Sequence, residues 1–221
     1  MVAMGYSQVE WYMGSEYKRD RKRGTLEISQ TQFIKSVLNR FDVSKTSYIP
    51  ATPSLDLRYA SEEETMVDVP FREIVGSLMW ISNQTRPDIA NAVRAVARFS
   101  HEPKPTHYKA ALKILEYLNA TSDLGLVFKK SSDLECIQLE FDLDTYVDAD
   151  YAHKAEDRRS VSGAAIFCGG TLVYWFSRTQ KCVTLSTTEA EYVAMADDVK
   201  GNPQVPHAQC RVKRHCLFRA Q

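Results

Sequence analysis

The stretch YVDADYAHKAEDRRSVSGAAIFCGGTLVYWFSRTQKCVTLSTTEAEYVAMAD, residues 146–197, decides the fold. With the residues just before it, this stretch alternates polar and apolar side chains with a period of two, which is typical of strands. Three strands are predicted, at residues 136–150, 162–169 and 171–177. The pair Gly169-Gly170 predicts a tight turn between the last two strands, since glycine readily adopts positive φ angles.

A helix is predicted directly after these strands. Ser186 or Thr187 can cap its first turn, and its apolar residues recur at helical spacing to about Lys200. The order strand, hairpin, strand, helix predicts a three-stranded antiparallel sheet with one helix packed on it.

Carboxylates occur where the first strand ends and where the helix begins. Asp148 and Asp150 lie on one face of the strand, whereas Glu189 and Glu191 point about 200° apart, so only one glutamate faces the sheet. Two divalent cations ~3.5–4 Å apart, held by several such oxygens, can cleave a phosphodiester. Solubility and the helix dipole explain the same residues without a metal. The spacing alone leaves both interpretations open.

Upstream, residues 11–29 predict a β-hairpin. WYMGSEY forms one strand, KRDRKRG a charged turn, and TLEIS the other strand. Ser29 and Gln32 then form a capping-box signature for a helix whose apolar stripe ends near Phe41.

Three further helices are predicted between Pro70 and about residue 118, separated by prolines. The first of them has an apolar stripe formed by Phe71, Ile74, Val75, Leu78 and Met79. The acidic segment 56–68 predicts an exposed loop before this block, and the block is followed by a strand candidate, LGLVFKK.

The quoted stretch resembles the ribonuclease H segment of copia-type retrotransposon polyproteins, because DRRSVSG, WFSRTQ and LSTTEAEYVA occur in that order. YMGSEYKRDRKRGTLEISQTQFIKSVLNRF is similar to the region after the polymerase palm of that family. REIVGSLMWISNQTRPDIANAVRAVARFSHEPKPTHYKAALKILEYL is similar to its helical connection. The resemblance covers about residues 11–200.

The resemblance implies an α/β chain with an incomplete ribonuclease H-like mixed sheet, preceded by a β-hairpin and a small helical subdomain. It divides the chain into the end of a reverse transcriptase (1–55), a helical connection (56–124) and a partial ribonuclease H domain (125–200). Residues 201–221 lie outside the family, and because they have no apolar period, no acid and two prolines, we predict a disordered tail. The implied activities are RNA-directed DNA synthesis and Mg²⁺-dependent hydrolysis of RNA in RNA–DNA hybrids.

The resemblance also implies the site residues. Asp148 corresponds to the first metal-binding aspartate and Glu191 to the metal-binding glutamate, with Asp150 and Glu189 as second choices. The implied cofactor is Mg²⁺, and the implied partners are RNA–DNA hybrid or single-stranded nucleic acid, together with the rest of a Pol polyprotein.

The chain departs from the family pattern in two respects. The paired aspartates of the polymerase do not occur in it, and no strand with a third metal-binding aspartate is recognisable after Lys200. Asp197 and Asp198 lie about two helical turns beyond Glu191, ~9–10 Å away, and do not replace that aspartate. We therefore expect little or no catalysis, and a sheet with an unpaired edge.

Local cations could hold a phosphate backbone. Lys18, Arg19, Arg21, Lys22 and Arg23 surround the hairpin turn, and Arg158 and Arg159 follow the first strand of the quoted stretch. A solvated loop explains both groups without a ligand and is the favoured interpretation. Trp11, Trp80 and Trp175 could stack on bases, but aromatic residues within amphipathic segments predict core positions.

The bulk composition excludes some classes of protein. Lys+Arg and Asp+Glu are both 28, so no global basic field indicates nucleic acid binding. Five widely spread cysteines without a CxxC pair favour free thiols in a reducing compartment. No signal peptide or membrane span is recognisable. We expect an intracellular protein, in the cytoplasm or in virus-like particles.

Overall fold

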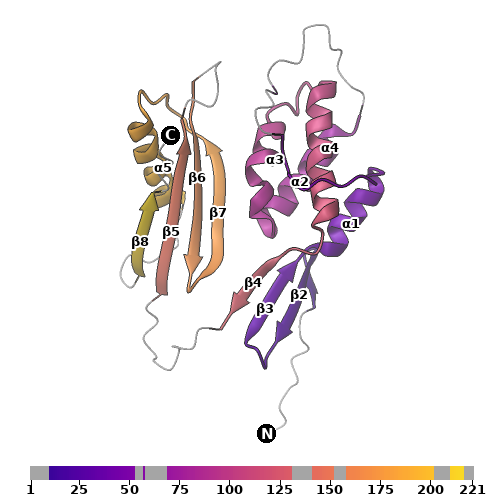
Figure 1. Ribbon diagram of the computed structural model, residues 1–221, viewed down its shortest axis with the longest axis horizontal. Coiled ribbons are helices and arrows are strands. Elements are labelled where there is room, and N and C mark those ends of the chain that lie inside the picture. The colour runs from indigo at the N-terminus through magenta and orange to yellow at the C-terminus, as the bar shows by residue number, and fades with distance from the viewer. Residues whose placement is uncertain are drawn as a thin grey trace. The chain divides into compact units, whose positions relative to one another are not determined.

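The computed structural model describes residues 10–52, 57, 69–130, 141–151, 158–201 and 210–216. The chain divides into two compact units, residues 1–129 and 130–221 (Figure 1). Most of the acidic segment 56–68, expected to be a loop, lies outside the described residues. Among the described residues, no helix is both long and apolar enough to cross a membrane.

The first unit begins with the predicted hairpin, extended into a four-stranded antiparallel sheet. Its strands are β1 (Trp11–Tyr12), β2 (Ser15–Asp20), β3 (Thr25–Ser29) and β4 (Leu126–Lys129), in the order β1-β2-β3-β4. β2 and β3 are joined by the charged turn, where Gly24 has a φ of 63°. A hairpin is therefore present, but the predicted single strand WYMGSEY is broken at Met13-Gly14, whose φ angles are 48° and 76°, and Trp11–Tyr12 fold back on β2. The second strand of the hairpin, β3, pairs with a strand about a hundred residues later in the chain.

The position of β4 corrects the predicted domain boundary. LGLVFKK was expected to open the partial ribonuclease H domain, but β4 pairs with β3 and belongs to the first unit. Gly125 permits this pairing: a Cβ at this position would lie 2.4 Å from the carbonyl oxygen of Ile28. Since only glycine fits so close to another backbone, the chain at Gly125 can turn into the sheet.

Four α-helices and a short 3-10 helix form the core of the first unit. They are α1 (Thr31–Arg40), α2 (Phe71–Gln84), η1 (Pro87–Ile89), α3 (Ala90–Ala97) and α4 (Pro105–Ala120). The predicted stripes are largely buried, with Ile34, Ile74 and Leu78 fully so, although Met79 is 45% exposed. α1 packs on α2 and α4 in one hydrophobic cluster. The regions expected as 1–55 and 56–124 therefore share one core, because the apolar face of α1 is covered by the later helices.

The start of α1 differs from the predicted capping box. The helix begins after Gln30, and no side chain of the cap residue bonds to its first turn. Instead, Glu16 of β2 accepts a hydrogen bond from the backbone N–H of Gln32 at 2.8 Å. A carboxylate from the neighbouring sheet therefore satisfies a donor that the sequence signature assigned to Ser29.

The second unit contains the predicted antiparallel strands and helix. Its elements are β5 (Phe141–Asp150), β6 (Val161–Cys168), β7 (Thr171–Thr179), α5 (Thr187–Gly201) and β8 (Cys210–Cys216), with sheet order β7-β6-β5-β8 (Figure 1). Gly169 and Gly170 form the predicted turn, with φ angles of 55° and 76°. α5 packs on β5 and β6 through Val147, Ala164 and Ala194.

β8 corrects the expectation of a disordered tail and of an unpaired sheet edge at β5. Residues Cys210–Cys216 pair in parallel with β5, from Phe141 opposite Cys210 to Val147 opposite Cys216. An exposed strand edge offers unpaired backbone groups that a further strand can satisfy with little help from its side chains. The remaining tail residues, 202–209 and 217–221, lie outside the described residues.

The tryptophans do not occupy the core positions that their amphipathic context predicted. Trp11 is 52% exposed, and Trp80 and Trp175 are only partly buried. Trp11 lies in β1, a two-residue strand at the edge of its sheet.

Candidate functional site

Asp148 and Glu191 come from two elements that pack on each other. Asp148 lies near the end of β5 and Glu191 in the second turn of α5. Ala194, on the same helix face as Glu191, packs against Val147, so this contact brings the glutamate to the strand. Glu191 Oε1 accepts a hydrogen bond from the backbone N–H of Ala149 at 3.3 Å. The pairing of β8 with β5 ends at Val147, so Glu191 reaches β5 just beyond that ladder.

The environment of Glu191 disfavours its ionised form. Burial raises the pKa of its carboxyl, the hydrogen bond from Ala149 partly offsets this, and the charge of Asp148 raises the pKa further. Glu191 is 9% exposed, and its Oε2 has no hydrogen-bond partner among the described residues. An unpartnered buried carboxylate oxygen is destabilising unless a proton or a cation compensates its charge. Asp148 itself is exposed, and its charge acts on the Glu191 carboxyl; carboxylate oxygens of this kind are ligands that could hold one divalent cation.

The second-choice carboxylates lie elsewhere. Asp150, at the end of β5, is exposed. Glu189 is also exposed, and its Oε2 accepts a hydrogen bond from the backbone N–H of Leu185 at 2.6 Å. Ser186 Oγ accepts one from the N–H of Glu189 at 3.1 Å. Glu189 and Ser186 therefore cap α5, in agreement with the predicted role of Ser186.

No third carboxylate joins Asp148 and Glu191 in the part of the chain that the structure describes. Asp197 Oδ2 accepts a hydrogen bond from Ser162 Oγ at 3.1 Å, so its carboxylate points to β6. Within the described ranges, no group of three or more His, Cys, Asp and Glu side chains could hold a metal ion. The described residues thus supply a carboxylate pair and no cage for two ions.

The predicted nucleic-acid-binding cations are exposed. Lys18, Arg19, Arg21, Lys22 and Arg23 all lie at the β2–β3 end of the first sheet. Asp20 shapes this turn: its Oδ1 accepts hydrogen bonds from the N–H groups of Lys22 and Arg23 at 2.9 and 3.0 Å. Arg158 and Arg159 are exposed just before β6, and Arg158 has a φ of 51°. The two groups belong to different units.

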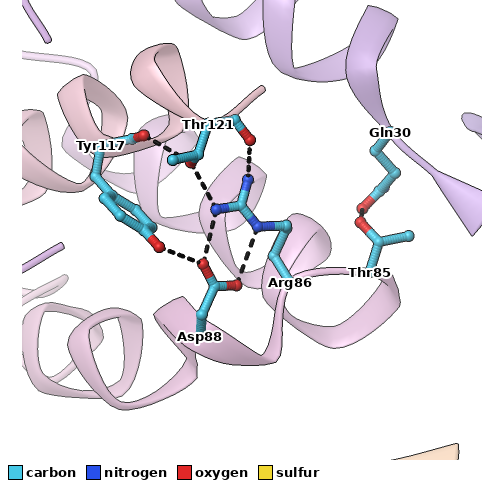
Figure 2. Close-up of polar contacts among 6 residues, drawn as sticks. All are labelled: Gln30, Thr85, Arg86, Asp88, Tyr117 and Thr121. Atoms are coloured by element: carbon cyan, nitrogen blue, oxygen red, sulfur yellow. Dashed lines mark hydrogen bonds and ion pairs between the residues drawn. The ribbon is translucent and has the colours of Figure 1, made fainter. Parts of the chain in front are cut away.

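A buried arginine joins the helices of the first unit (Figure 2). Arg86 is 1% exposed. Its Nε and Nη2 donate to the two carboxylate oxygens of Asp88 at 3.0 and 2.7 Å, while Nη1 donates to the carbonyl of Thr121 at 2.7 Å. Tyr117 donates to Asp88 Oδ2 at 2.8 Å. Arg86 therefore joins the end of α2 to the end of α4, directly before the chain turns into β4.

Arg86 favours the charged form of Asp88. Burial alone would raise the pKa of Asp88, but the hydrogen bonds and charge of Arg86, with the hydrogen bond from Tyr117, outweigh it and hold the pKa below the ordinary value of 3.8. Thr85, the residue before Arg86, donates to Gln30 Oε1 at 2.8 Å and so connects α2 to the start of α1 (Figure 2). This cluster is structural, because its charges are satisfied internally.

Comparison with known proteins gives the family of the chain. It is 35% identical over 196 residues to the "Retrovirus-related Pol polyprotein from transposon TNT 1-94" of Nicotiana tabacum, a match that covers 85% of this chain and 14% of that polyprotein. It is 34% identical over 194 residues to the corresponding polyprotein from transposon RE1 of Arabidopsis thaliana, covering 87% of this chain and 13% of the polyprotein. This chain belongs to the copia-type, retrovirus-related Pol polyprotein family.

A shorter relative of this Pol chain is the "Secreted RxLR effector protein 161" of Plasmopara viticola. It is 38% identical over 132 residues, which cover 60% of this chain and 88% of the effector. The Pol chain thus spans about one seventh of the polyproteins it matches and most of the effector. No family model and no solved structure matches it.

In this Pol chain, the three runs that carried the resemblance meet in a buried polar network that the sequence did not reveal. Gln180, which is 1% exposed, donates through Nε2 to Ser162 Oγ at 3.1 Å and to the carbonyl of Ala190 at 2.9 Å. Ser160 and Thr184 share a hydrogen bond of 3.0 Å between their hydroxyls. Because Ala190 precedes Glu191, Gln180 fixes the backbone that carries the glutamate. A weak signal in the sequence is that Ser162 and Ala164, two residues apart, share one face of a strand.

Proposed function

We propose that this chain is the junction of the reverse transcriptase and ribonuclease H regions of a copia-type Pol polyprotein, with an incomplete metal site in its second unit. The observation that carries the proposal is Glu191, which reaches from α5 to β5 and leaves a buried oxygen without a partner among the described residues. Such an arrangement destabilises the fold and is retained most readily where a ligand compensates it.

The topology of the second unit supports the ribonuclease H assignment. β8 follows α5, where the family resemblance expects the next strand, and it pairs in parallel with β5. In that family this strand carries a third metal-binding aspartate. The sequence of β8, CRVKRHC, contains no aspartate or glutamate.

Asp148 and Glu191 would hold the cation. Bound Mg²⁺ would supply charge stabilisation and an activated water for phosphodiester hydrolysis. Of the protein's own groups, Glu191 places an oxygen at the end of β5, Asp148 adds a second negative charge, and Gln180 holds the helix backbone in place. Two carboxylates bind Mg²⁺ weakly, because the ion gives up its hydration shell reluctantly. We therefore propose that this chain hydrolyses RNA in RNA–DNA hybrids very slowly or not at all.

Cleavage of a labelled RNA–DNA hybrid by the purified chain, with and without Mg²⁺, tests this proposal, with Asp148→Asn measured in parallel. The expected result is no Mg²⁺-dependent cleavage above that of Asp148→Asn. Cleavage that the substitution abolishes would show that the pair suffices and would overturn the proposed inactivity. Weak Mn²⁺ binding that both Asp148→Asn and Glu191→Gln abolish is the expected sign of the incomplete site.

A second candidate function is a catalytically silent module that binds nucleic acid or another part of a Pol polyprotein. The exposed cations around the β2–β3 turn favour nucleic acid, with RNA–DNA hybrid or single strands as the partner. The effector relative favours a module that exists apart from a full-length polyprotein, since most of the effector's length matches this chain. Hybrid binding without cleavage is the result expected of this function. Under either proposal, a cytoplasmic location or one within virus-like particles fits the partner.

A further inference from the structure

We propose that Lys129 of β4 joins the basic β2–β3 turn in one composite cationic surface that binds the sugar-phosphate backbone of nucleic acid. The surface consists of Lys18, Arg21, Lys22, Arg23 and Lys129; Arg19, which pairs with Leu26, lies on the opposite face of the sheet. The inference rests on the nucleic-acid partner proposed above, and it adds a residue that the sequence places more than a hundred positions from the turn.

The register of the sheet brings Lys129 to the turn. Lys129 pairs with Thr25, and Thr25 pairs with Asp20, so all three lie in one row across β4, β3 and β2 at the turn end of the sheet. Directly paired residues share a face, so Lys129 lies on the same face as Lys18. Gly125 fixes this register, because a side chain at that position would collide with β3.

The charges of this surface are available to a ligand. All five cations are exposed. Asp20, the acid within the turn, already accepts two backbone hydrogen bonds and lies 3.6 Å from Arg23 Nε. Glu27 is another acid on this face, where it pairs with Lys18 on one side and Val127 on the other. In a chain of zero formal net charge, this end of the sheet is a strongly positive region.

The geometry favours a polyanion with regularly spaced charges. At ~3.3 Å per residue along a strand and ~4.8 Å between strands, Lys18 and Lys129 lie roughly 10–12 Å apart on one face. This distance corresponds to about three nucleotides at ~3.4 Å of rise. A single small anion would contact one or two of these cations, whereas a nucleic-acid backbone spans the row. The expected recognition is independent of sequence and depends strongly on salt.

The test measures binding of a short labelled RNA–DNA hybrid to the full chain over a range of salt concentrations. Lys129→Gln is compared with Lys35→Gln, which removes the same charge from an exposed position on α1. Lys129→Gln is expected to weaken binding and to lower the slope of log affinity against log salt by about 0.7–0.9, the loss of one phosphate contact. Lys35→Gln is expected to leave that slope unchanged.

Glu27→Gln provides a second test, because it is expected to strengthen binding and a misfolded variant would weaken it. Removal of this negative charge from the surface is expected to tighten hybrid binding by about twofold. Equal effects of Lys129→Gln and Lys35→Gln, with no gain from Glu27→Gln, would overturn the composite surface and leave the proposed function standing. Absence of any hybrid binding by the unsubstituted chain would overturn both.

Discussion

At the scale of single residues, two glutamates of α5 have opposite effects on the stability of the fold. Glu189 is exposed, and its carboxylate accepts a backbone hydrogen bond that stabilises the start of the helix. Glu191 is buried, and burial together with Asp148 raises its pKa. The same chemical group therefore stabilises the structure at one position and destabilises it two residues later, which is typical of a functional constraint.

The first prediction is that Glu191→Gln stabilises the second unit. The neutral amide can still accept the hydrogen bond from Ala149 and removes a buried charge, so we expect a gain of about 1 kcal/mol, or roughly 4 °C in Tm. Thermal unfolding followed by circular dichroism measures the change. Glu189→Gln, the matched control, should lower Tm slightly, because a charged group at a helix N-terminus is replaced by a neutral one. A loss of stability in Glu191→Gln would contradict the interpretation.

The second prediction concerns pH and Asp88. Its pKa is lower in the folded chain than its ordinary value of 3.8, so the folded state favours the carboxylate. This contribution to stability is complete above the unfolded pKa and is lost as the pH falls through about 4 towards the folded pKa. Urea unfolding at descending pH should therefore show the first unit weakening in this range.

Asp88→Asn should remove this pH dependence. It should also cost about 3 kcal/mol at neutral pH, since it leaves the buried charge of Arg86 without a carboxylate. An unchanged acid profile in Asp88→Asn would show that other carboxylates govern the transition.

At the scale of elements, β4 belongs to the first sheet because it pairs with β3. Its four residues follow α4, whose end is held by hydrogen bonds from Arg86 to Thr121. Gly125 then permits the close approach to β3. The helical core thus delivers β4 to the hairpin, and Lys129 to the basic turn.

The third prediction is that Gly125→Ala loosens this sheet. The added Cβ would meet the Ile28 carbonyl at 2.4 Å, so β4 must shift, at a cost of about 2 kcal/mol. Hydrogen exchange should quicken at the amides of β3 and β4. The control is Gly76→Ala in α2, where nothing lies within 4 Å of the new Cβ and alanine should add about 0.5–1 kcal/mol. Equal behaviour of the two variants would exclude the steric account.

At the scale of the whole molecule, each unit contains a sheet with one edge strand that lies far along the chain from its neighbour in the sheet. β4 completes the first sheet, and β8 borders β5 in the second. The formal net charge of zero adds little repulsion between copies of the chain. Solubility at neutral pH therefore depends on how well the sheet edges are covered.

The fourth prediction is that Val212→Pro promotes association. Proline in β8, where Val212 pairs with Leu143, interferes with the ladder and leaves the edge of β5 open to other chains. Light scattering at neutral pH should rise relative to the unsubstituted chain. Val212→Thr is the control, because it keeps the β-branched shape and the backbone donor, and it should remain as dispersed as the parent. Equal scattering by both variants would contradict a protective role for β8.

The site was only partly predictable from the sequence. Asp148 and Glu191 were selected by resemblance, and the pattern of α5 excluded one of the two glutamates without saying which. The packing of Ala194 on Val147 directs Glu191 to the strand. Gln180, Arg86 and Lys129 gave no signal, because a polar residue at the end of an element is normally exposed and only its neighbours show that it is buried or paired.

The sequence by itself determined the hairpin, most of the helices and the antiparallel strands of the second unit, because the period of apolar residues and glycine turns are local properties. Only the tertiary structure decided that β4 belongs to the hairpin sheet, that Cys210–Cys216 form a strand, and that Glu16 caps α1. Each of these depends on a backbone group left unpaired by one element and satisfied by another far along the chain. Local patterns do not encode such pairings.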